Sequence, residues 1–150
     1  YLGLIKRLWP NAPIIHCQRD LMDCAWSNYK ILFAEGNNYS YDQSEIVRYF
    51  RAKEKLMTHW RKVAAGGFLD LSYEDMVSNQ EQQTRLLLKY CNLPWEDTCM
   101  RFHKNSRSVR TASAAQVRKP IYKTSVKSWL PFQQFLQPLI SGLAQDKIVG

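Results

Sequence analysis

The sequence has no pair of cysteines in CxxC spacing and no cysteine at metal-ligand spacing from a histidine. This absence argues against a zinc site, and we expect no metal. The interpretation that remains is reduced, buried thiols in a cytoplasmic protein, which is favoured over a protein of the secretory-pathway lumen. The four cysteines are Cys17, Cys24, Cys91 and Cys99.

Long apolar runs, internal repeats and low-complexity tracts are also missing. Because a membrane-spanning helix needs about 20 apolar residues, no segment is expected to cross a membrane. Residues 1–6 contain neither an initiator Met nor the layout of a signal peptide, so we expect an internal part of a longer protein. Hydrophobic residues make up 45% and aromatic residues 13%, which argues against a disordered chain.

Acidic residues are few. The chain has 13 Asp and Glu against 21 Lys and Arg, and its net charge is +8. Such an excess suits a polyanionic partner, which could be a nucleic acid, a phosphorylated cofactor or an anionic membrane surface. Charge alone favours such a partner no more than it favours an inert basic surface.

Apolar spacing predicts a helix over residues 1–9, followed by prolines and then a buried, β-branched strand over 13–17. Asp20 is placed to cap a helix that runs to about Phe33. A second long helix is expected over 44–64, with a buried stripe. That stripe consists of Ile46, Val47, Phe50, Met57, Trp60 and Ala64.

The second half of the chain begins with an alternating segment at 68–73 that predicts another strand. Ser78 and Glu81 have the spacing of a capping box for a helix that ends near Cys91. Residues 103–123 read as a loop, and an amphipathic helix that includes Phe132, Phe135 and Leu143 is expected after it. The element order predicts an α/β fold with a parallel sheet, whose missing strands we expect upstream of Tyr1.

Arg19 directly follows the first predicted strand, and Ser27 lies eight residues later in the next helix. Ligands of open parallel sheets bind at the carboxyl ends of the strands, and a guanidinium suits a phosphate. The amino end of the helix adds partial positive charge at the same place. This pattern indicates a phosphate site, while an ion pair of Arg19 with Asp20 or Asp23 remains an alternative.

Four ordered segments resemble 3′-phosphoadenylyl sulfate (PAPS)-dependent sulfotransferases. The nearest resemblance is to bacterial sulfotransferases linked to tetratricopeptide repeats and to tyrosylprotein sulfotransferases. It implies that residues 1–150 are the C-terminal part of a single sulfotransferase domain, with a P-loop-NTPase-like parallel sheet flanked by helices. The segments are HCQRDLMDCAWSNY (16–29), FLDLSYEDMV (68–77), YCNLPWED (90–97) and VRTASAAQVRKPIY (109–122).

The resemblance also implies roles for single residues. Arg19 and Ser27 would bind the 3′-phosphate, and Tyr73 would lie against the adenosine. The loop 113–122 would close over the nucleotide, with Ser113 as a catalytic residue near the sulfuryl group. Donor contacts are further implied for Ser113, Gln116, Val117, Arg118, Lys119 and Lys127.

The sequence departs from the family at two positions. Leu21 stands where the family has Pro, and Ser128 stands where it often has a basic residue, with Lys127 one position earlier. The loop that binds the 5′-phosphosulfate and the general base are both expected upstream. We therefore expect the 150 residues alone to be inactive.

The implied reaction moves a sulfuryl group from PAPS to a hydroxyl or amine and leaves 3′,5′-adenosine bisphosphate, without a metal. The acceptor stays open between carbohydrate, peptide tyrosine and small molecule. The other expected partners are the upstream part of the protein and tetratricopeptide repeats, with no nucleic acid and no membrane. Two alternatives are a kinase-like transferase and a nucleic-acid-binding module that uses the basic loop at 104–119.

Overall fold

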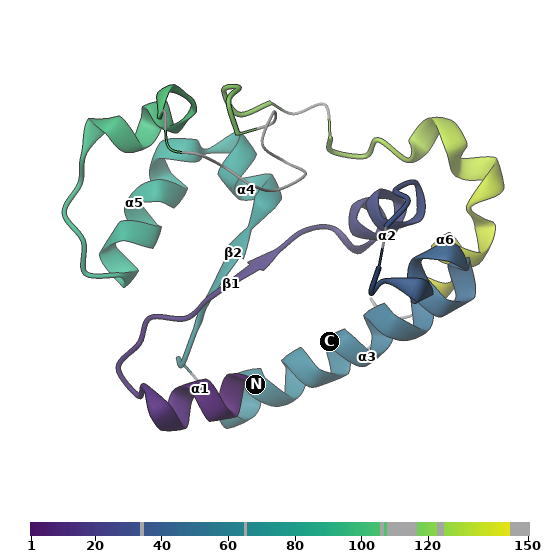
Figure 1. Cartoon of the computed structure of the whole chain (residues 1–150), viewed down its shortest axis with the longest axis horizontal. Coiled ribbons are helices and arrows are strands. Elements are labelled where there is room, and N and C mark those ends of the chain that lie inside the picture. Colours follow the sequence, from purple (N-terminus) through teal and green to yellow (C-terminus); the bar gives the residue numbers. More distant parts are fainter. Residues whose placement is uncertain (34, 65, 106, 108–116, 123–124, 145–150) are drawn as a thin grey trace.

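The structure is a computed structural model that describes residues 1–150 except 34, 65, 106, 108–116, 123–124 and 145–150. It alternates helices with two short strands (Figure 1). In chain order the elements are α1 (Leu2–Leu8), β1 (Ile15–Gln18), α2 (Leu21–Tyr29), the 3₁₀ helix η1 (Asn38–Tyr41), α3 (Gln43–Val63), β2 (Leu69–Ser72), α4 (Tyr73–Ser78), α5 (Gln80–Tyr90), the 3₁₀ helices η2 (Asp97–Lys104) and η3 (Leu130–Phe135), and α6 (Gln137–Ala144).

Strands β1 and β2 pair in parallel, with Ile15 opposite Leu69 and Gln18 opposite Ser72. The predicted α/β class with parallel strands is therefore confirmed. The predicted burial of the first strand is wrong, because Cys17 is exposed. The other three residues of β1 are only partly buried, and each strand has one open edge in this two-stranded sheet. Cys24, Cys91 and Cys99 are partly buried, and all four thiols are free.

The buried core lies among helices rather than on the sheet. It joins Ala25 of α2 to the amino-terminal half of α3, to Leu136 and to α6. Figure 1 shows α2 and α6 gathered at one end of the long helix α3, with the sheet and α5 to the side. The buried residues of this cluster are Ala25, Ile46, Val47, Phe50, Leu136, Leu139 and Leu143.

Helix α2 confirms the predicted cap and corrects the predicted end. The Asp20 carboxylate accepts a hydrogen bond from the Asp23 amide at 3.1 Å, as an N-cap does. The helix ends at Tyr29 instead of Phe33. The predicted range included Ile31 and Leu32, but both are exposed, so little apolar burial favours a longer helix.

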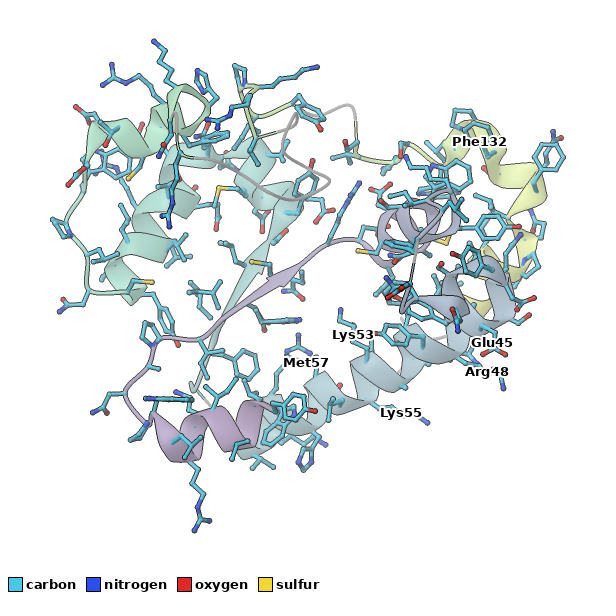
Figure 2. All side chains as sticks on the ribbon, viewed as in Figure 1. Glu45, Arg48, Lys53, Lys55, Met57 and Phe132 are labelled. Atoms are coloured by element: carbon cyan, nitrogen blue, oxygen red, sulfur yellow. The ribbon has the colours of Figure 1, made fainter. Side chains whose placement is uncertain are left out.

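Helix α3 begins after Asp42, whose carboxylate accepts from the amides of Ser44 and Glu45. Of the predicted stripe, Ile46, Val47 and Phe50 are buried and the later positions are only partly buried. In Figure 2, Lys53 and Met57 lie on the side of α3 that faces the sheet, while Arg48 and Lys55 lie on the opposite side. The core therefore covers only the first half of this helix.

The predicted capping box at Ser78 is wrong. Ser78 is the last residue of α4, and Asn79 precedes α5. Glu81 accepts a hydrogen bond from Arg85 one turn later, at 2.9 Å. The serine that does cap a helix is Ser72, whose hydroxyl accepts from the Asp75 amide at the start of α4.

The predicted C-terminal helix is divided at Leu136 into η3 and α6. Pro138 is in the first turn of α6, where its missing N–H costs little, so it starts a new helix instead of sitting inside an old one. Phe132 and Phe135 are exposed, contrary to the predicted stripe, although Phe132 stacks on Trp26 at 4.6 Å. The described residues of the predicted loop that follow Lys104 belong to no helix or strand.

No helix in the described ranges is both long and apolar enough to pass through a membrane.

Gly142 permits the close approach of α6 to α3 and provides a test of the core. A Cβ at this position would lie 2.5 Å from Val47 Cγ2, so Gly142→Ala should force the helices apart. We expect a loss of about 1–3 kcal/mol in the free energy of unfolding, the usual cost of overpacking. Urea unfolding of the protein measures it. The neighbouring exposed Ser141→Ala should change stability by less than about 0.5 kcal/mol, and equal stability of both variants would contradict this packing.

The cross-strand pair His16–Asp70 predicts a pH dependence of stability. Asp70 Oδ1 lies 2.6 Å from His16 Nδ1, and Arg61 Nε donates to Asp70 Oδ2 at 3.1 Å. Burial raises the pKa of Asp70, but the hydrogen bonds and charges of Arg61 and His16 outweigh it and leave the pKa below its usual 3.8.

Because the folded-state pKa is the lower one, this contribution is complete above pH 3.8 and is lost as the pH falls through the folded value. The Asp70 side chain is 32% exposed, so we expect about 1 kcal/mol or less. Urea unfolding of wild type and Asp70→Asn over this acid range measures the difference. Parallel pH profiles of the two proteins would contradict the assignment.

Candidate functional site

Arg19 and Tyr73 leave the sheet side by side. Since Gln18 pairs with Ser72, the next residue of each strand lies at the same carboxyl edge. The Arg19 guanidinium lies over the Tyr73 ring, with Cζ 4.8 Å from the ring centroid. Tyr73 is the first residue of α4 rather than the last of the strand, as the sequence had suggested.

Glu74 fastens the two strand ends together. One carboxylate oxygen accepts from the Asp20 amide at 3.1 Å, and the other accepts from the Ser72 hydroxyl at 3.3 Å. Asp20 and Ser72 are the N-caps of α2 and α4. These two hydrogen bonds fix the starts of α2 and α4 relative to each other. They thereby also fix the position of Arg19 relative to Tyr73.

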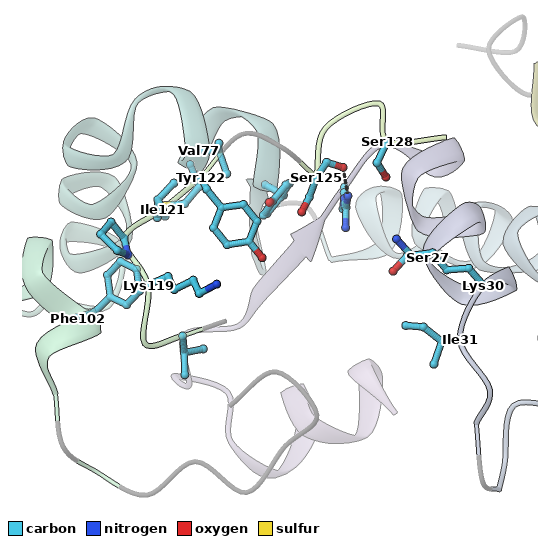
Figure 3. A pocket seen from close by; sticks show the side chains of 15 residues that line it. Ser27, Lys30, Ile31, Val77, Phe102, Lys119, Ile121, Tyr122, Ser125 and Ser128 are labelled. Atoms are coloured by element: carbon cyan, nitrogen blue, oxygen red, sulfur yellow. Dashed lines mark hydrogen bonds between the residues drawn. The ribbon is translucent and has the colours of Figure 1, made fainter. Parts of the chain in front are cut away.

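A cavity of about 420 Å³ opens at this edge, within the size range of small-molecule sites. It brings together five residues that sequence analysis singled out, Arg19, Ser27, Tyr73, Val117 and Lys119. Figure 3 shows Ser27 and Lys30 on one side of the cavity and Lys119 and Tyr122 on the other. The full lining is Arg19, Ser27, Lys30, Ile31, Tyr73, Met76, Val77, Phe102, Val117, Lys119, Pro120, Ile121, Tyr122, Ser125 and Ser128.

The charge of the lining favours an anion. Arg19, Lys30 and Lys119 are cations, and no Asp or Glu is among the described residues that line the cavity. The hydroxyls of Ser27, Ser125 and Ser128 add neutral hydrogen-bond donors. Cations and hydroxyls without a competing carboxylate are the groups that hold a phosphate or sulfate.

The other part of the lining is apolar and aromatic. Phe102, Ile121 and Tyr122 line it together with the Tyr73 ring and with Met76 and Val77 of α4. A planar ring could pack there while an anionic group meets the cations. The cavity therefore suits a ligand that is polar at one end and aromatic at the other, such as a nucleotide.

Arg19 is held by the protein and keeps donors to spare. Its Nη2 donates to the Ser125 carbonyl at 2.5 Å, while its Nε is buried with no acceptor in the described part of the chain. Among the described ion pairs, none joins Arg19 to Asp20 or Asp23, so the structure does not support the alternative that sequence analysis left open. A buried guanidinium donor without an acceptor fits an anionic oxygen at the site.

Cys24 lies near this arginine on α2 and is partly buried. Burial raises the pKa of the Cys24 thiol, and the positive charge of Arg19 offsets this only in part. The thiol therefore stays protonated near neutral pH, and a nucleophilic role for it is disfavoured.

The remaining residues singled out from sequence are not in the lining. Arg118 is exposed, and its Nη2 donates to the Arg107 carbonyl at 2.6 Å. Lys127 is also exposed, and its backbone amide donates to Asp23 Oδ2 at 2.8 Å. Ser113 and Gln116 fall outside the described residues, so their implied roles stay predictions.

Sequence reasoning missed Lys30 and Ser125. Lys30 lies three residues after Ser27 and faces the same cavity, and this helical spacing was the signal that could have identified it. Ser125 had no such signal, since its carbonyl meets Arg19 across 106 residues. Within the described ranges, no group of three or more His, Cys, Asp or Glu is arranged to hold a metal ion.

Two comparisons with known proteins bear on this site. A family model described as "Sulfotransferase family" matches residues 1–97, a range that includes Arg19, Ser27 and Tyr73. The chain is also 37% identical over 148 residues to a protein of Aquifex aeolicus (strain VF5) that is described as uncharacterized. That alignment covers 97% of this chain and 19% of the relative, so the chain spans about a fifth of that protein's length.

Proposed function

The chain belongs to the sulfotransferase family, and we propose that it holds the 3′-phosphate and adenosine of PAPS during sulfuryl transfer. The observation that carries this proposal is the cavity that Arg19, Ser27 and Tyr73 share at the carboxyl edge of the sheet. Of the three hypotheses that the sequence left open, sulfuryl transfer is the one that family membership supports.

In this proposal the cationic part of the cavity takes the 3′-phosphate. Arg19 offers donors in a planar fork, and Ser27 offers a hydroxyl from the helix that starts at the same edge. Lys30 and Lys119 line the same cavity and add positive charge. Such a set of donors suits a doubly charged phosphate ester.

The adenosine then lies toward the aromatic part of the lining. The Tyr73 ring is already oriented by the Arg19 guanidinium over it. Phe102, Ile121 and Tyr122 supply apolar surface for a purine. Binding at both ends would orient the donor, and orientation is a large part of catalysis in group transfer.

The proposed reaction breaks the bond between sulfur and the bridging oxygen of the 5′-phosphate. An acceptor oxygen or nitrogen attacks sulfur, its proton passes to a base, and 3′,5′-adenosine bisphosphate leaves with the bridging electron pair. The residues of this chain bind and orient the nucleotide that leaves. We assign no base within this chain and expect it, with the 5′-phosphosulfate loop, upstream.

Several narrower points remain predictions. They include the P-loop-like sheet, the role of 1–150 as the C-terminal part of one domain, and the likeness to tetratricopeptide-linked and tyrosylprotein enzymes. The catalytic role of Ser113, the donor contacts of Gln116, Arg118 and Lys127, the acceptor class, a cytoplasmic location and the inactivity of the 150 residues alone belong with them.

Arg19→Ala tests the phosphate contact. Because removal of one partner of a buried charged hydrogen bond costs about 3 kcal/mol, we expect a roughly 100-fold weaker affinity for 3′,5′-adenosine bisphosphate. The affinity for ADP, which has no 3′-phosphate, should be weak in wild type and change little. Titration calorimetry on the full-length protein measures both.

The matched control is Arg85→Ala. Arg85 also lies over an aromatic ring, with Cζ 3.8 Å from the Trp95 centroid, but it lines a different groove. Its removal should leave nucleotide affinity within about twofold of wild type. Tighter binding of ADP than of the bisphosphate would instead support a kinase-like enzyme.

Two substitutions at Tyr73 separate the contribution of its ring to nucleotide binding from that of its hydroxyl. Tyr73→Phe keeps the ring under Arg19 and should keep the affinity for the bisphosphate within about threefold. Tyr73→Leu removes the cation–π contact and the aromatic surface, so we expect about tenfold weaker binding. If both variants bind as wild type does in the same calorimetric titration, Tyr73 does not contact the adenosine.

A further inference from the structure

Asp23 is the most deeply buried charged residue of the described chain, and the proposed donor contacts do not use it. It lies in the first turn of α2 with 1% of its surface exposed. It is not among the residues that line the cavity. A buried carboxylate is costly unless it is hydrogen-bonded, so its position calls for a structural or functional reason.

The partner of Asp23 lies far away in the sequence. Its Oδ2 accepts a hydrogen bond from the backbone amide of Lys127 at 2.8 Å, across 104 residues. Its Oδ1 is buried and has no hydrogen-bond partner among the described residues. The carboxylate thus fastens α2 to the turn at 125–129.

A second bond joins the same two segments. Arg19, four residues before Asp23, donates from Nη2 to the carbonyl of Ser125, two residues before Lys127. Two side chains near the junction of β1 and α2 therefore hold this turn. Arg19 donates to the turn at Ser125, and Asp23 accepts from it at Lys127. The side chains of Ser125 and Ser128, from the same turn, line the cavity (Figure 3).

The conformation of Lys127 shows that this turn is held against a local preference. Its φ is +56°, in the left-handed region that residues with a Cβ adopt at a cost. The Lys127 amide points at the Asp23 carboxylate in this conformation. The hydrogen bond to Asp23 is one interaction that offsets that cost.

We infer that Asp23 is a positioning residue of the donor site and acts through the turn at 125–129 on the guanidinium of Arg19. Asp23 holds the Lys127 amide, the turn holds the Ser125 carbonyl in place, and that carbonyl fixes Arg19 over Tyr73 at the cavity. Lys127 contributes its backbone amide to this arrangement. The inference rests on the proposed function for its ligand. The hydrogen bond between the Lys127 amide and the Asp23 carboxylate, called the latch below, exists without a ligand.

Three variants of the full-length protein test this inference by titration with 3′,5′-adenosine bisphosphate. Asp23→Ala should weaken binding about tenfold, whereas Asp23→Asn keeps an amide oxygen that can accept from Lys127 and should stay within about threefold. Asp42→Ala removes a carboxylate cap from α3 and should lower the melting temperature without changing nucleotide affinity.

A double-mutant cycle separates positioning from general stability. If Asp23 acts through Arg19, Asp23→Ala in an Arg19→Ala background should cause less than about a twofold further loss. A full tenfold loss in that background would show that the two residues act independently. Wild-type affinity of Asp23→Ala would also overturn the inference.

Hydrogen exchange tests the latch in the absence of nucleotide. Asp23→Ala should speed exchange in a peptide that contains 125–129, while exchange in α5 (Gln80–Tyr90) stays unchanged. Unchanged exchange at 125–129 would reject the latch. If wild type does not bind the bisphosphate, the proposed function fails, and the exchange result still decides whether the latch is present.

Discussion

The parallel pairing of β1 with β2 is the constraint on which the site depends. The register puts Gln18 opposite Ser72, so Arg19 and Tyr73 emerge at one edge although 53 residues separate them in sequence. Glu74 then bonds to the start of α2 and to the hydroxyl that caps α4. A shift of the register by one residue would turn every side chain of β1 to the other face and separate the guanidinium from the ring.

Around this edge the chain separates two kinds of surface. Arg19, Lys30 and the hydroxyls of α2 and of the turn at 125–129 line one part of the cavity, and aromatic and aliphatic side chains line the other together with Lys119 (Figure 3). The basic charge of the whole chain gave no reason to prefer a nucleotide over a nucleic acid. The preference arises from local arrangement, because three cations and an aromatic surface line one open cavity without a carboxylate among its described lining.

The sequence predicted what depends on neighbours along the chain. The two strands, the Asp20 cap, the long helix α3 and the position of Arg19 after a strand follow from local spacing. The errors come from packing that no local pattern contains. Cys17 is exposed on a strand that is otherwise only partly buried, and α2 stops at Tyr29, after which Ile31 and Leu32 are exposed. The contacts of Arg19 with Ser125 and of Asp23 with Lys127 join residues more than 100 positions apart, and no spacing rule reaches that far.

The proposed site requires that a nucleotide's 3′-phosphate bind between the first strand and the helix after it. A crystal structure of the full-length protein with 3′,5′-adenosine bisphosphate would locate this phosphate. We expect it within hydrogen-bond distance of the Arg19 guanidinium and the Ser27 hydroxyl, with the purine toward Tyr73. A nucleotide bound away from this cavity, or one whose 3′-phosphate points from Arg19 into solvent, would contradict it.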